Sequence, residues 1–182
     1  MTARATKRRP AKPVEPLAFM FHDDGVVPNN TRLPLLYYRG ALDLGGTRDP
    51  AGAIETLFNR NGWGGMWRNG IYPFVHYHSQ THEALGIARG RATVRFGGDQ
   101  GQELEIGGGD VALLPAGIGH QCLWASADLV VIGAYPPEGR YDLCRGSSAE
   151  HAKALQSIPK VPLPKSDPVH GENGPLLELW RK

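Results

Sequence analysis

The chain has 182 residues, of which 41% are hydrophobic, so it has about one domain's worth of material and can bury a core without disulfides. Its net charge is only +2, and no apolar stretch reaches the roughly 18 residues of a membrane span or follows the N-terminus as in a secretory signal. Cys122 and Cys144 lack the spacing of a zinc ribbon or a redox pair. We therefore expect a cytoplasmic protein that does not enter a membrane and keeps both cysteines reduced.

A short basic segment opens the chain, and the rest is slightly acidic. Within residues 1–16, Glu15 is the one acidic residue against Arg4, Lys7, Arg8, Arg9 and Lys12. Such a segment could contact nucleic acid, but it lacks the aromatic residues and the folded basic face of effective nucleic-acid binders. We expect a disordered, solvated tail, so nucleic acid is an unlikely partner.

Residues 17–62 predict two strands and one helix. The apolar runs Leu17–Phe21 and Leu33–Tyr38 are short and end at turn signals, which is typical of strands. A helix is predicted to begin at Asp49-Pro50 and to stop before Gly62. Asp is a favoured N-cap, Pro fits the first helical position, and Gly commonly follows the last turn.

Beyond Trp63 the sequence is strand-like, with short apolar runs and Gly-rich connections. The predicted strands are Tyr72–Tyr77, Glu83–Arg89, Arg91–Phe96, Gln102–Ile106, Asp110–Leu114, Gln121–Trp124 and Leu129–Tyr135. Many short strands at this spacing favour an all-β sandwich or barrel, and closing the sheet would remove its exposed edges. We therefore predict an all-β fold with one or two peripheral helices.

The C-terminal part, residues 146–182, is predicted to be an appendage of one domain that covers residues 17–145. A helix is expected from about Ala149 to Ile158, followed by a Pro-rich tail. The tail ends in the apolar segment Leu176–Trp180, which we expect to dock on the barrel or on a second subunit. The sequence shows no internal repeat.

Three histidines and one glutamate form the most informative pattern. His76 and His78 are two residues apart, so on a strand both rings point to the same side. Glu83 begins the next predicted strand, and His120 follows a separate turn. Three imidazoles and a carboxylate suit one divalent transition metal (Fe, Mn, Ni, Co or Zn) and leave open positions for a substrate.

The other histidines are expected to have no part in this site. His22, His151 and His170 each stand alone in a loop or terminal segment. His82 is adjacent to Glu83 and would point to the opposite side of a strand. We expect His82 to lie outside the metal ligands, and its exchange for Glu83 is the alternative.

Two spaced motifs carry a resemblance to a known family. The first runs from Gly70 to Gly90 as Gly70-x5-His76-x-His78-x4-Glu83-x6-Gly90. The second runs from Gly109 to His120 as Gly109-x5-Pro115-x-Gly117-x2-His120. Together they resemble the two signature motifs of the cupin superfamily. The segments around Asp23 and Asp142 are also similar to the YjlB-like subgroup of small bacterial cupins.

The resemblance implies a double-stranded β-helix, the cupin jelly-roll barrel, and often a homodimer. It also places His76, His78, Glu83 and His120 at the family's four metal-ligand positions. The sequence departs from the family at Trp124, where the second motif usually has asparagine. That position is not a metal ligand in the family, so the departure concerns the pocket rather than the metal.

Further residues are expected to shape a pocket beside the metal. If the strand after His120 is regular, Cys122 and Trp124 lie on the same side as His120 and line the cavity. Trp67, Arg68 and Tyr72 are the other pocket candidates, at the wall or the mouth. Glu83 could also act as a base if it binds the metal only weakly.

Two functions follow from this pattern. The first is a metal-dependent enzyme acting on a small anionic or enolisable substrate, of the dioxygenase, isomerase or decarboxylase type. The alternative is a non-catalytic cupin that binds a small molecule and uses the metal for structure or recognition. No serine-hydrolase elbow, P-loop, zinc-protease motif or dinucleotide motif competes with these hypotheses.

Overall fold

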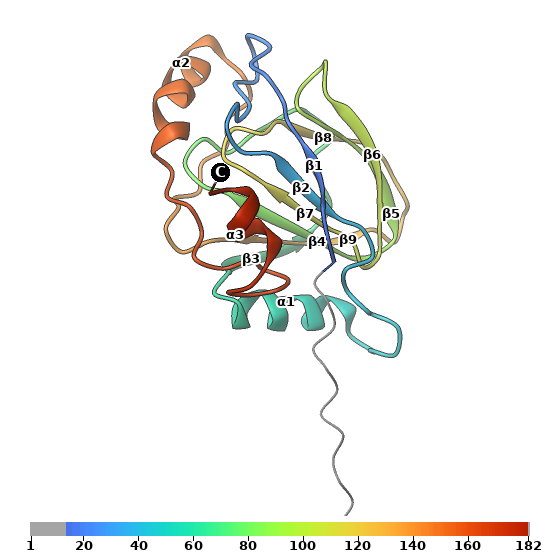
Figure 1. Cartoon of the computed structure of the whole chain (residues 1–182). Helices are drawn as coiled ribbons and strands as arrows, with labels where there is room; N and C mark the ends of the chain where they lie inside the picture. The colour runs from blue at the N-terminus through green and yellow to red at the C-terminus, as the bar shows by residue number, and fades with distance from the viewer. Residues whose placement is uncertain (1–13, 182) are drawn as a thin grey trace, which may run out of the picture.

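Two antiparallel β-sheets face each other in the computed structural model, which describes residues 14–181 (Figure 1). The strands are β1 (Leu17–Phe19), β2 (Leu35–Tyr38), β3 (Gly64–Asn69), β4 (Glu83–Arg89), β5 (Arg91–Phe96), β6 (Gln102–Gly107), β7 (Val111–Leu114), β8 (His120–Ala125) and β9 (Val130–Tyr135). The larger sheet has the order β1-β2-β7-β4-β9-β3 and the smaller one β6-β5-β8. This arrangement confirms the predicted all-β class. Residues 1–13 of the expected basic tail lie outside the described residues.

Alternation along the central strands divides the core into an inner and an outer cluster. On β4, Leu85 and Ile87 point into the space between the sheets, while Ala84 and Ala88 point to the outside of the larger sheet. The same alternation continues along β2 and β7, whose residues are all buried. Strands buried on both faces have nearly continuous apolar sequences, and the sequences of these strands follow that pattern.

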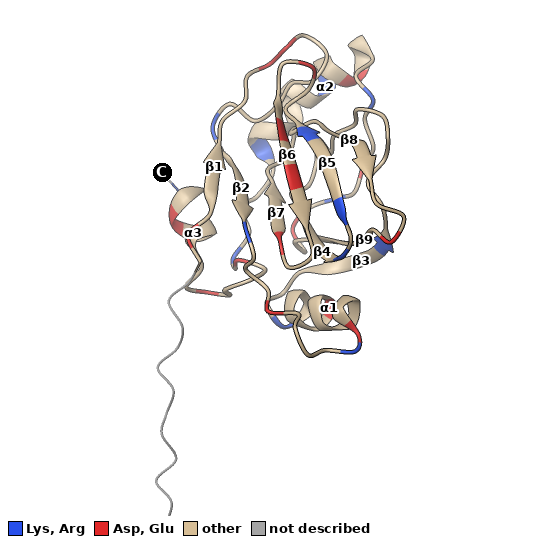
Figure 2. Cartoon of the chain, turned by 90° about the vertical axis from the view of Figure 1, so that its right-hand side faces the viewer, with Lys and Arg blue, Asp and Glu red and all other residues tan. Residues whose placement is uncertain are grey.

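The outer face of the larger sheet is covered by α1 (Pro50–Arg60) and α3 (Pro175–Leu179) (Figures 1 and 2). Asp49 caps α1 by accepting a hydrogen bond from the Gly52 N–H at 2.9 Å, as its place before proline predicts. Helix α1 buries Ile54 and Phe58 in the outer cluster. The C-terminal apolar segment packs in the same cluster, so it docks on its own barrel.

Helix α2 (Ser148–Ser157) and the 3-10 turn η1 (Ile158–Lys160) lie beside the barrel, in orange in Figure 1. A capping box forms between Ser147 and Glu150 at the start of α2. The residue after Glu150 is His151, whose Nε2 lies 2.8 Å from the Asp23 carboxylate. This contact fastens α2 to the loop that follows β1.

The structure has one strand that was not predicted, and it lacks one that was. The segment Gly64–Asn69 forms β3 although Gly-Gly-Met-Trp-Arg-Asn lacks strand alternation, because an irregular register between Gly64 and Trp67 breaks the period. The segment Tyr72–Tyr77 is not a regular strand. Pro73 has no N–H to donate, and only His76 and Tyr77 form isolated bridges, with His120 and Cys144.

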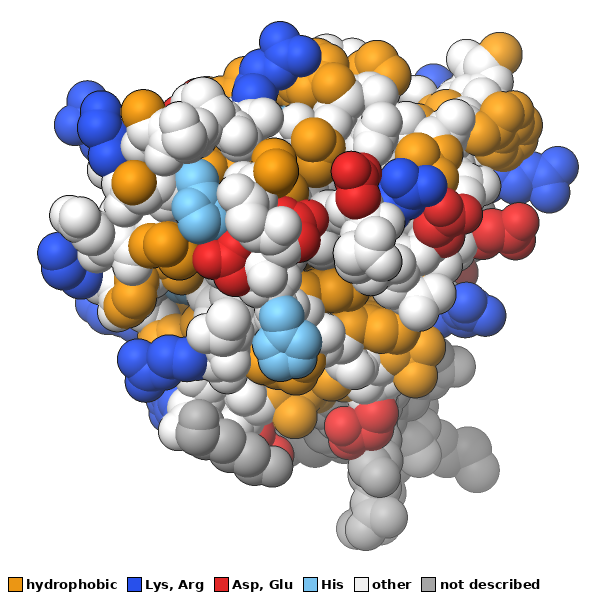
Figure 3. Space-filling model, turned by 90° about the horizontal axis from the view of Figure 1, so that it is seen from above, with side chains coloured by type: hydrophobic (Ala, Val, Ile, Leu, Met, Phe, Trp, Pro, Cys, Tyr) orange, Lys and Arg blue, Asp and Glu red, His pale blue; other side chains and the backbone are white. Residues whose placement is uncertain are grey.

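The exposed side of the smaller sheet carries charged residues on β5 and β6 (Figure 2). Arg95 on β5 pairs with Glu103 on β6 at 2.8 Å. In the view from above, Lys and Arg side chains stand apart, mostly toward the rim (Figure 3). Among residues 14–181, no helix is long and apolar enough to cross a membrane. Both cysteines are free.

Candidate functional site

Three elements meet at one end of the space between the sheets and bring the predicted histidines together. Glu83 starts β4 and His120 starts β8, so both are positioned by regular strands. His76 lies in the irregular segment before β4 and is joined to His120 by two backbone hydrogen bonds, of 3.2 and 2.9 Å. Tyr77 points the other way and packs under α2 with Ala154. His76 and His78 therefore share one side, as predicted, although their segment is not a strand.

These residues form the floor of a cavity of about 450 Å³. Its lining comprises Gly65, Trp67, Arg68, Asn69, Gly70, Ile71, Tyr72, His76, His78, Glu83, Leu85, His120, Tyr135 and Tyr141. One ligand atom from each of the three histidines lies within 4.8 Å of the others, and all three side chains are buried. Such a buried group could hold a metal ion.

Backbone carbonyls orient the three imidazole rings. His76 Nδ1 lies 3.1 Å from the Phe74 carbonyl oxygen, and His120 Nδ1 lies 3.3 Å from that of Ile118. His78 Nδ1 is hydrogen-bonded to the Asp142 carbonyl. Because a carbonyl can only accept, Nδ1 carries the proton in each neutral ring, and the lone pair is left on Nε2. This is the arrangement in which a metal-binding histidine is held by its surroundings.

Glu83 completes the floor with an oxygen that has no hydrogen-bond partner. Its Oε2 lies 3.3 Å from His78 Nε2 and 3.4 Å from His120 Nε2. Within the described part of the chain, this buried atom forms no hydrogen bond. A buried carboxylate oxygen is costly without a partner. The three histidines form the group whose ligand atoms lie within 4.8 Å of one another, and Glu83 approaches two of them. Its position fits a further ligand for a divalent cation held by the three rings.

Burial and charge determine how these groups ionise. Burial lowers the pKa of His76 to about 3, and the charge of His120 acts in the same direction. Burial alone would raise the pKa of Glu83, but the neighbouring charge of His78 holds it below its usual range. Glu83 is therefore an anion at neutral pH and a weak base. This favours a ligand role over the predicted role as a base.

His82 lies outside this group, and both of its ring nitrogens are occupied. Its Nδ1 accepts a hydrogen bond of 3.0 Å from the Ala116 N–H, and its Nε2 lies 3.2 Å from the Pro162 carbonyl. The ring also packs on Trp180, with centroids 4.8 Å apart. Burial lowers the pKa of His82 to about 4, so the ring is neutral. His82 joins the turn before His120 to the C-terminal tail.

We expect replacement of His82 by alanine to destabilise the protein by about 3 kcal/mol without changing its metal content. The variant leaves the Ala116 N–H and the Pro162 carbonyl without their partner and creates a cavity. Urea unfolding and elemental analysis measure the two quantities. His22→Ala, at an exposed loop position, is the matched control. A His82→Ala protein with wild-type stability and no metal would instead make His82 a ligand.

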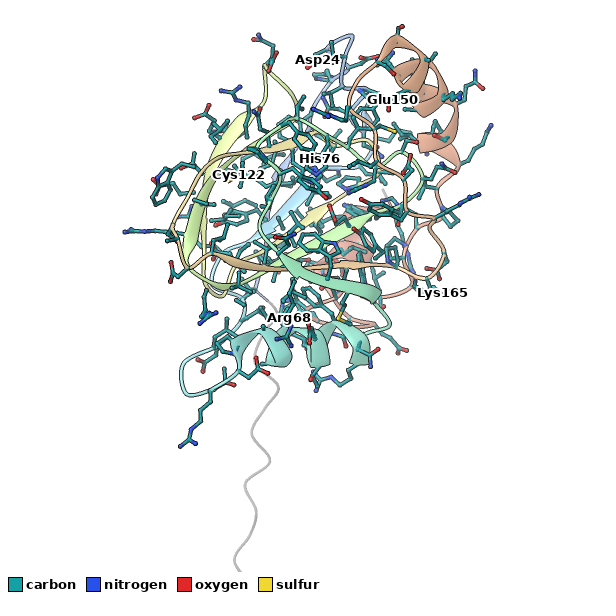
Figure 4. The ribbon with its side chains drawn as sticks, turned by 180° about the vertical axis from the view of Figure 1, so that it is seen from behind. Asp24, Arg68, His76, Cys122, Glu150 and Lys165 are labelled. Carbon is teal, nitrogen blue, oxygen red and sulfur yellow. The ribbon has the colours of Figure 1, made fainter. Side chains whose placement is uncertain are left out.

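The pocket residues predicted from the sequence divide into two groups. Trp67, Arg68 and Tyr72 line the cavity. Arg68 lies beside α1 (Figure 4), where its guanidinium binds both oxygens of Glu55 at 2.6 and 2.7 Å. Cys122 and Trp124 are not among the lining residues.

A bulge in β8 explains the positions of Cys122 and Trp124. Cys122 is opposite Val94 and faces the inner cluster, but Trp124 is opposite Thr93, the next residue of β5. The side chain of Trp124 is thus on the outer face, where it is 54% exposed. The assumption of a regular strand after His120 was wrong.

Sequence reasoning missed three residues of the site: Tyr135, Tyr141 and Asp142. Tyr135 and Tyr141 line the cavity, and their rings are 5.9 and 5.0 Å from that of His78. The Asp142 carboxylate accepts hydrogen bonds from Ser79 N and Oγ at 2.9 and 2.7 Å. Tyr135 could have been found from strand period, since it alternates with the inward-pointing Val131. The other two lie in a loop that offers no such signal.

Comparison with known proteins gives one close relative and more distant structures. The chain is 39% identical over 168 residues to the uncharacterised protein YjlB of Bacillus subtilis strain 168, covering 92% of this chain and 98% of that protein. It is similar to acireductone dioxygenase from Bacillus anthracis with a cadmium ion in its active centre, at 17% identity and a TM-score of 0.37, over 58% of this chain and 80% of that chain. It is also similar to RmlC from Streptococcus suis in complex with dTDP-D-xylose, at 11% identity and a TM-score of 0.30, over 92% and 96% of the two chains. No family model matches the chain.

Proposed function

This chain belongs to the family of Bacillus subtilis YjlB, and we propose that it is a cupin enzyme dependent on one divalent transition metal. The metal ligands in this proposal are the three histidines and the carboxylate at the cavity floor, His76, His78, His120 and Glu83. The observation that carries the proposal is the buried group of three histidine ring nitrogens, with the orphaned Glu83 oxygen beside two of them.

The charges around the cavity support a small anionic or enolisable substrate. A bound divalent ion supplies a Lewis acid that polarises substrate oxygen atoms. Glu83 offsets one of its two charges, so the floor retains a net positive charge. Above the floor, the walls are largely apolar or aromatic, including Ile71, Leu85 and Tyr72. A cavity of about 450 Å³ suits a metabolite rather than a polymer.

Within this proposal, the chain binds and orients the substrate and keeps water away from it. The apolar walls exclude water from the reacting oxygens, and the carbonyls that hold the imidazoles fix the ligand geometry. The reaction is of the dioxygenase, isomerase or decarboxylase type, because each of these acts on an electron-rich substrate that can bind a metal through its own oxygen atoms.

The proposal is tested by elemental analysis of untagged protein purified without chelator. We expect about one equivalent of iron, manganese, cobalt, nickel or zinc per chain. A His76→Ala/His120→Ala variant should lose this metal, while His22→Ala should keep it. Wild-type protein that stays metal-free after incubation with each ion would refute the site.

Turnover by the metal-loaded protein then separates an enzyme from a binder. A panel of small hydroxy and keto acids is followed by oxygen uptake and by NMR of the products. Conversion that the double histidine variant lacks would support catalysis. Binding of these acids without conversion would favour the non-catalytic cupin.

A further inference from the structure

One polar hydroxyl group in the cavity has a fixed position and no assigned role. Tyr135, at the end of β9, lines the cavity next to His78, with ring centroids 5.9 Å apart and nearly perpendicular. Its hydroxyl oxygen accepts a hydrogen bond of 2.8 Å from the Trp67 indole N–H. Both residues come from neighbouring strands, β3 and β9, of the larger sheet.

A glycine on β9 makes room for the indole that forms this bond. Trp67 is directly opposite Gly133, and a Cβ atom at Gly133 would lie 2.0 Å from Cε2 of the indole. Such a distance is impossible without moving the ring, so only glycine permits this position. The irregular register before Trp67 turns its side chain inward, toward the inner cluster.

The direction of the Trp67 hydrogen bond determines what the Tyr135 hydroxyl can do. An indole N–H can only donate, so the phenolic oxygen is the acceptor and its own proton points elsewhere. Glu83 is a neighbouring acceptor for that proton: after burial, the charge of Glu83 and its contact with the hydroxyl raise the pKa of Tyr135. Tyr135 and Glu83 both line the cavity, and a hydroxyl can turn its proton from one acceptor to another. The group can therefore donate to a ligand that lies beside Glu83 in the cavity.

We propose that Tyr135, held in place by Trp67, donates a hydrogen bond to an oxyanion of the substrate beside the metal site. The inference rests on the proposed function and narrows its substrate. A carboxylate or enolate oxygen is a strong acceptor for such a hydroxyl. Among the described lining residues, Arg68 is the one arginine or lysine, and it is already bound to both oxygens of Glu55. The substrate class is therefore a small acid that offers one oxygen to the metal and a second to Tyr135.

Three variants separate this role from packing. Tyr135→Phe removes the donor, Trp67→Phe removes the group that holds it, and Gly133→Ala displaces the indole. Tyr77→Phe is the matched control. The Tyr77 hydroxyl has no hydrogen-bond partner among the described residues, and its ring packs in the cluster under α2.

The experiment titrates oxalate, a small dicarboxylate probe, into the cobalt-loaded proteins by calorimetry. Metal content is measured on the same samples. We expect Tyr135→Phe to keep its cobalt and to bind oxalate about 10- to 100-fold more weakly. Trp67→Phe and Gly133→Ala should weaken binding in the same direction, and Tyr77→Phe should bind oxalate as wild type does.

A second readout needs no metal. In nitrogen-15 NMR spectra of the metal-free protein, the indole N–H resonance of Trp67, assigned from its loss in Trp67→Phe, should shift in Tyr135→Phe. Full cobalt content with wild-type oxalate affinity in Tyr135→Phe would overturn this inference alone. Wild-type protein that binds no cobalt would overturn the proposed function and this inference with it.

Discussion

Replacing Glu83 by glutamine is expected to weaken divalent-metal binding by at least about 100-fold. The substitution keeps the shape of the side chain but removes the only negative charge among the four proposed ligands. It also replaces one carboxylate oxygen by an NH₂ group, which cannot coordinate the metal. Competition with a coloured chelator at fixed pH measures the affinity.

Glu55→Gln is the matched control for this variant. It is the same chemical change on α1, where Glu55 pairs with Arg68 and does not line the cavity. We expect it to keep wild-type metal affinity. Equal affinity of Glu83→Gln and wild type would contradict the ligand role of Glu83, and the His82→Ala result would then show whether its neighbour takes that place.

Replacing Asp167 by alanine is expected to destabilise the protein by about 4 kcal/mol, the largest stability effect among these predictions. Asp167 is fully buried, and its carboxylate accepts a hydrogen bond of 2.5 Å from the Tyr38 hydroxyl. It also accepts from the backbone N–H groups of Val169, His170 and Leu176. Removing it leaves three buried donors and one half-buried donor without their acceptor.

Chemical denaturation followed by tryptophan fluorescence measures this change. Asp167→Asn should lose less stability, because its amide oxygen can still accept from the backbone. Asp128→Ala is an exposed control and should leave stability unchanged. A small effect of Asp167→Ala would mean that the C-terminal segment is held by apolar packing alone.

Much of the fold could be predicted from the sequence because local rules and burial agree there. The strand Glu83–Arg89 was predicted with its exact bounds, since its apolar run begins after polar residues and stops at a glycine. Helix α1 was also predicted, because Asp49 and Pro50 mark its start. The three histidines come together as their spacing implied.

The rest depends on contacts between distant residues. An irregular register cannot be read from one strand, so β3 was missed and Trp124 was placed on the wrong face. The carbonyl that orients His78 belongs to Asp142, which is 64 residues away. The expected homodimer and cytoplasmic location stay predictions.

Strand β4 is buried between β7 and β9, and this determines which parts of the protein can unfold locally. Amides in a strand paired on both sides and buried on both faces exchange their hydrogens only when most of the molecule unfolds. Glu83 and His120 begin strands of the two sheets. In contrast, His76 lies in an isolated bridge with His120, and His78 is held by a backbone hydrogen bond from Gly117 and a side-chain bond to Asp142. The four groups therefore span units of different local stability. An ion bound by all of them would slow local unfolding of residues 76–78 most, because it would tie this less stable segment to the more stable strands.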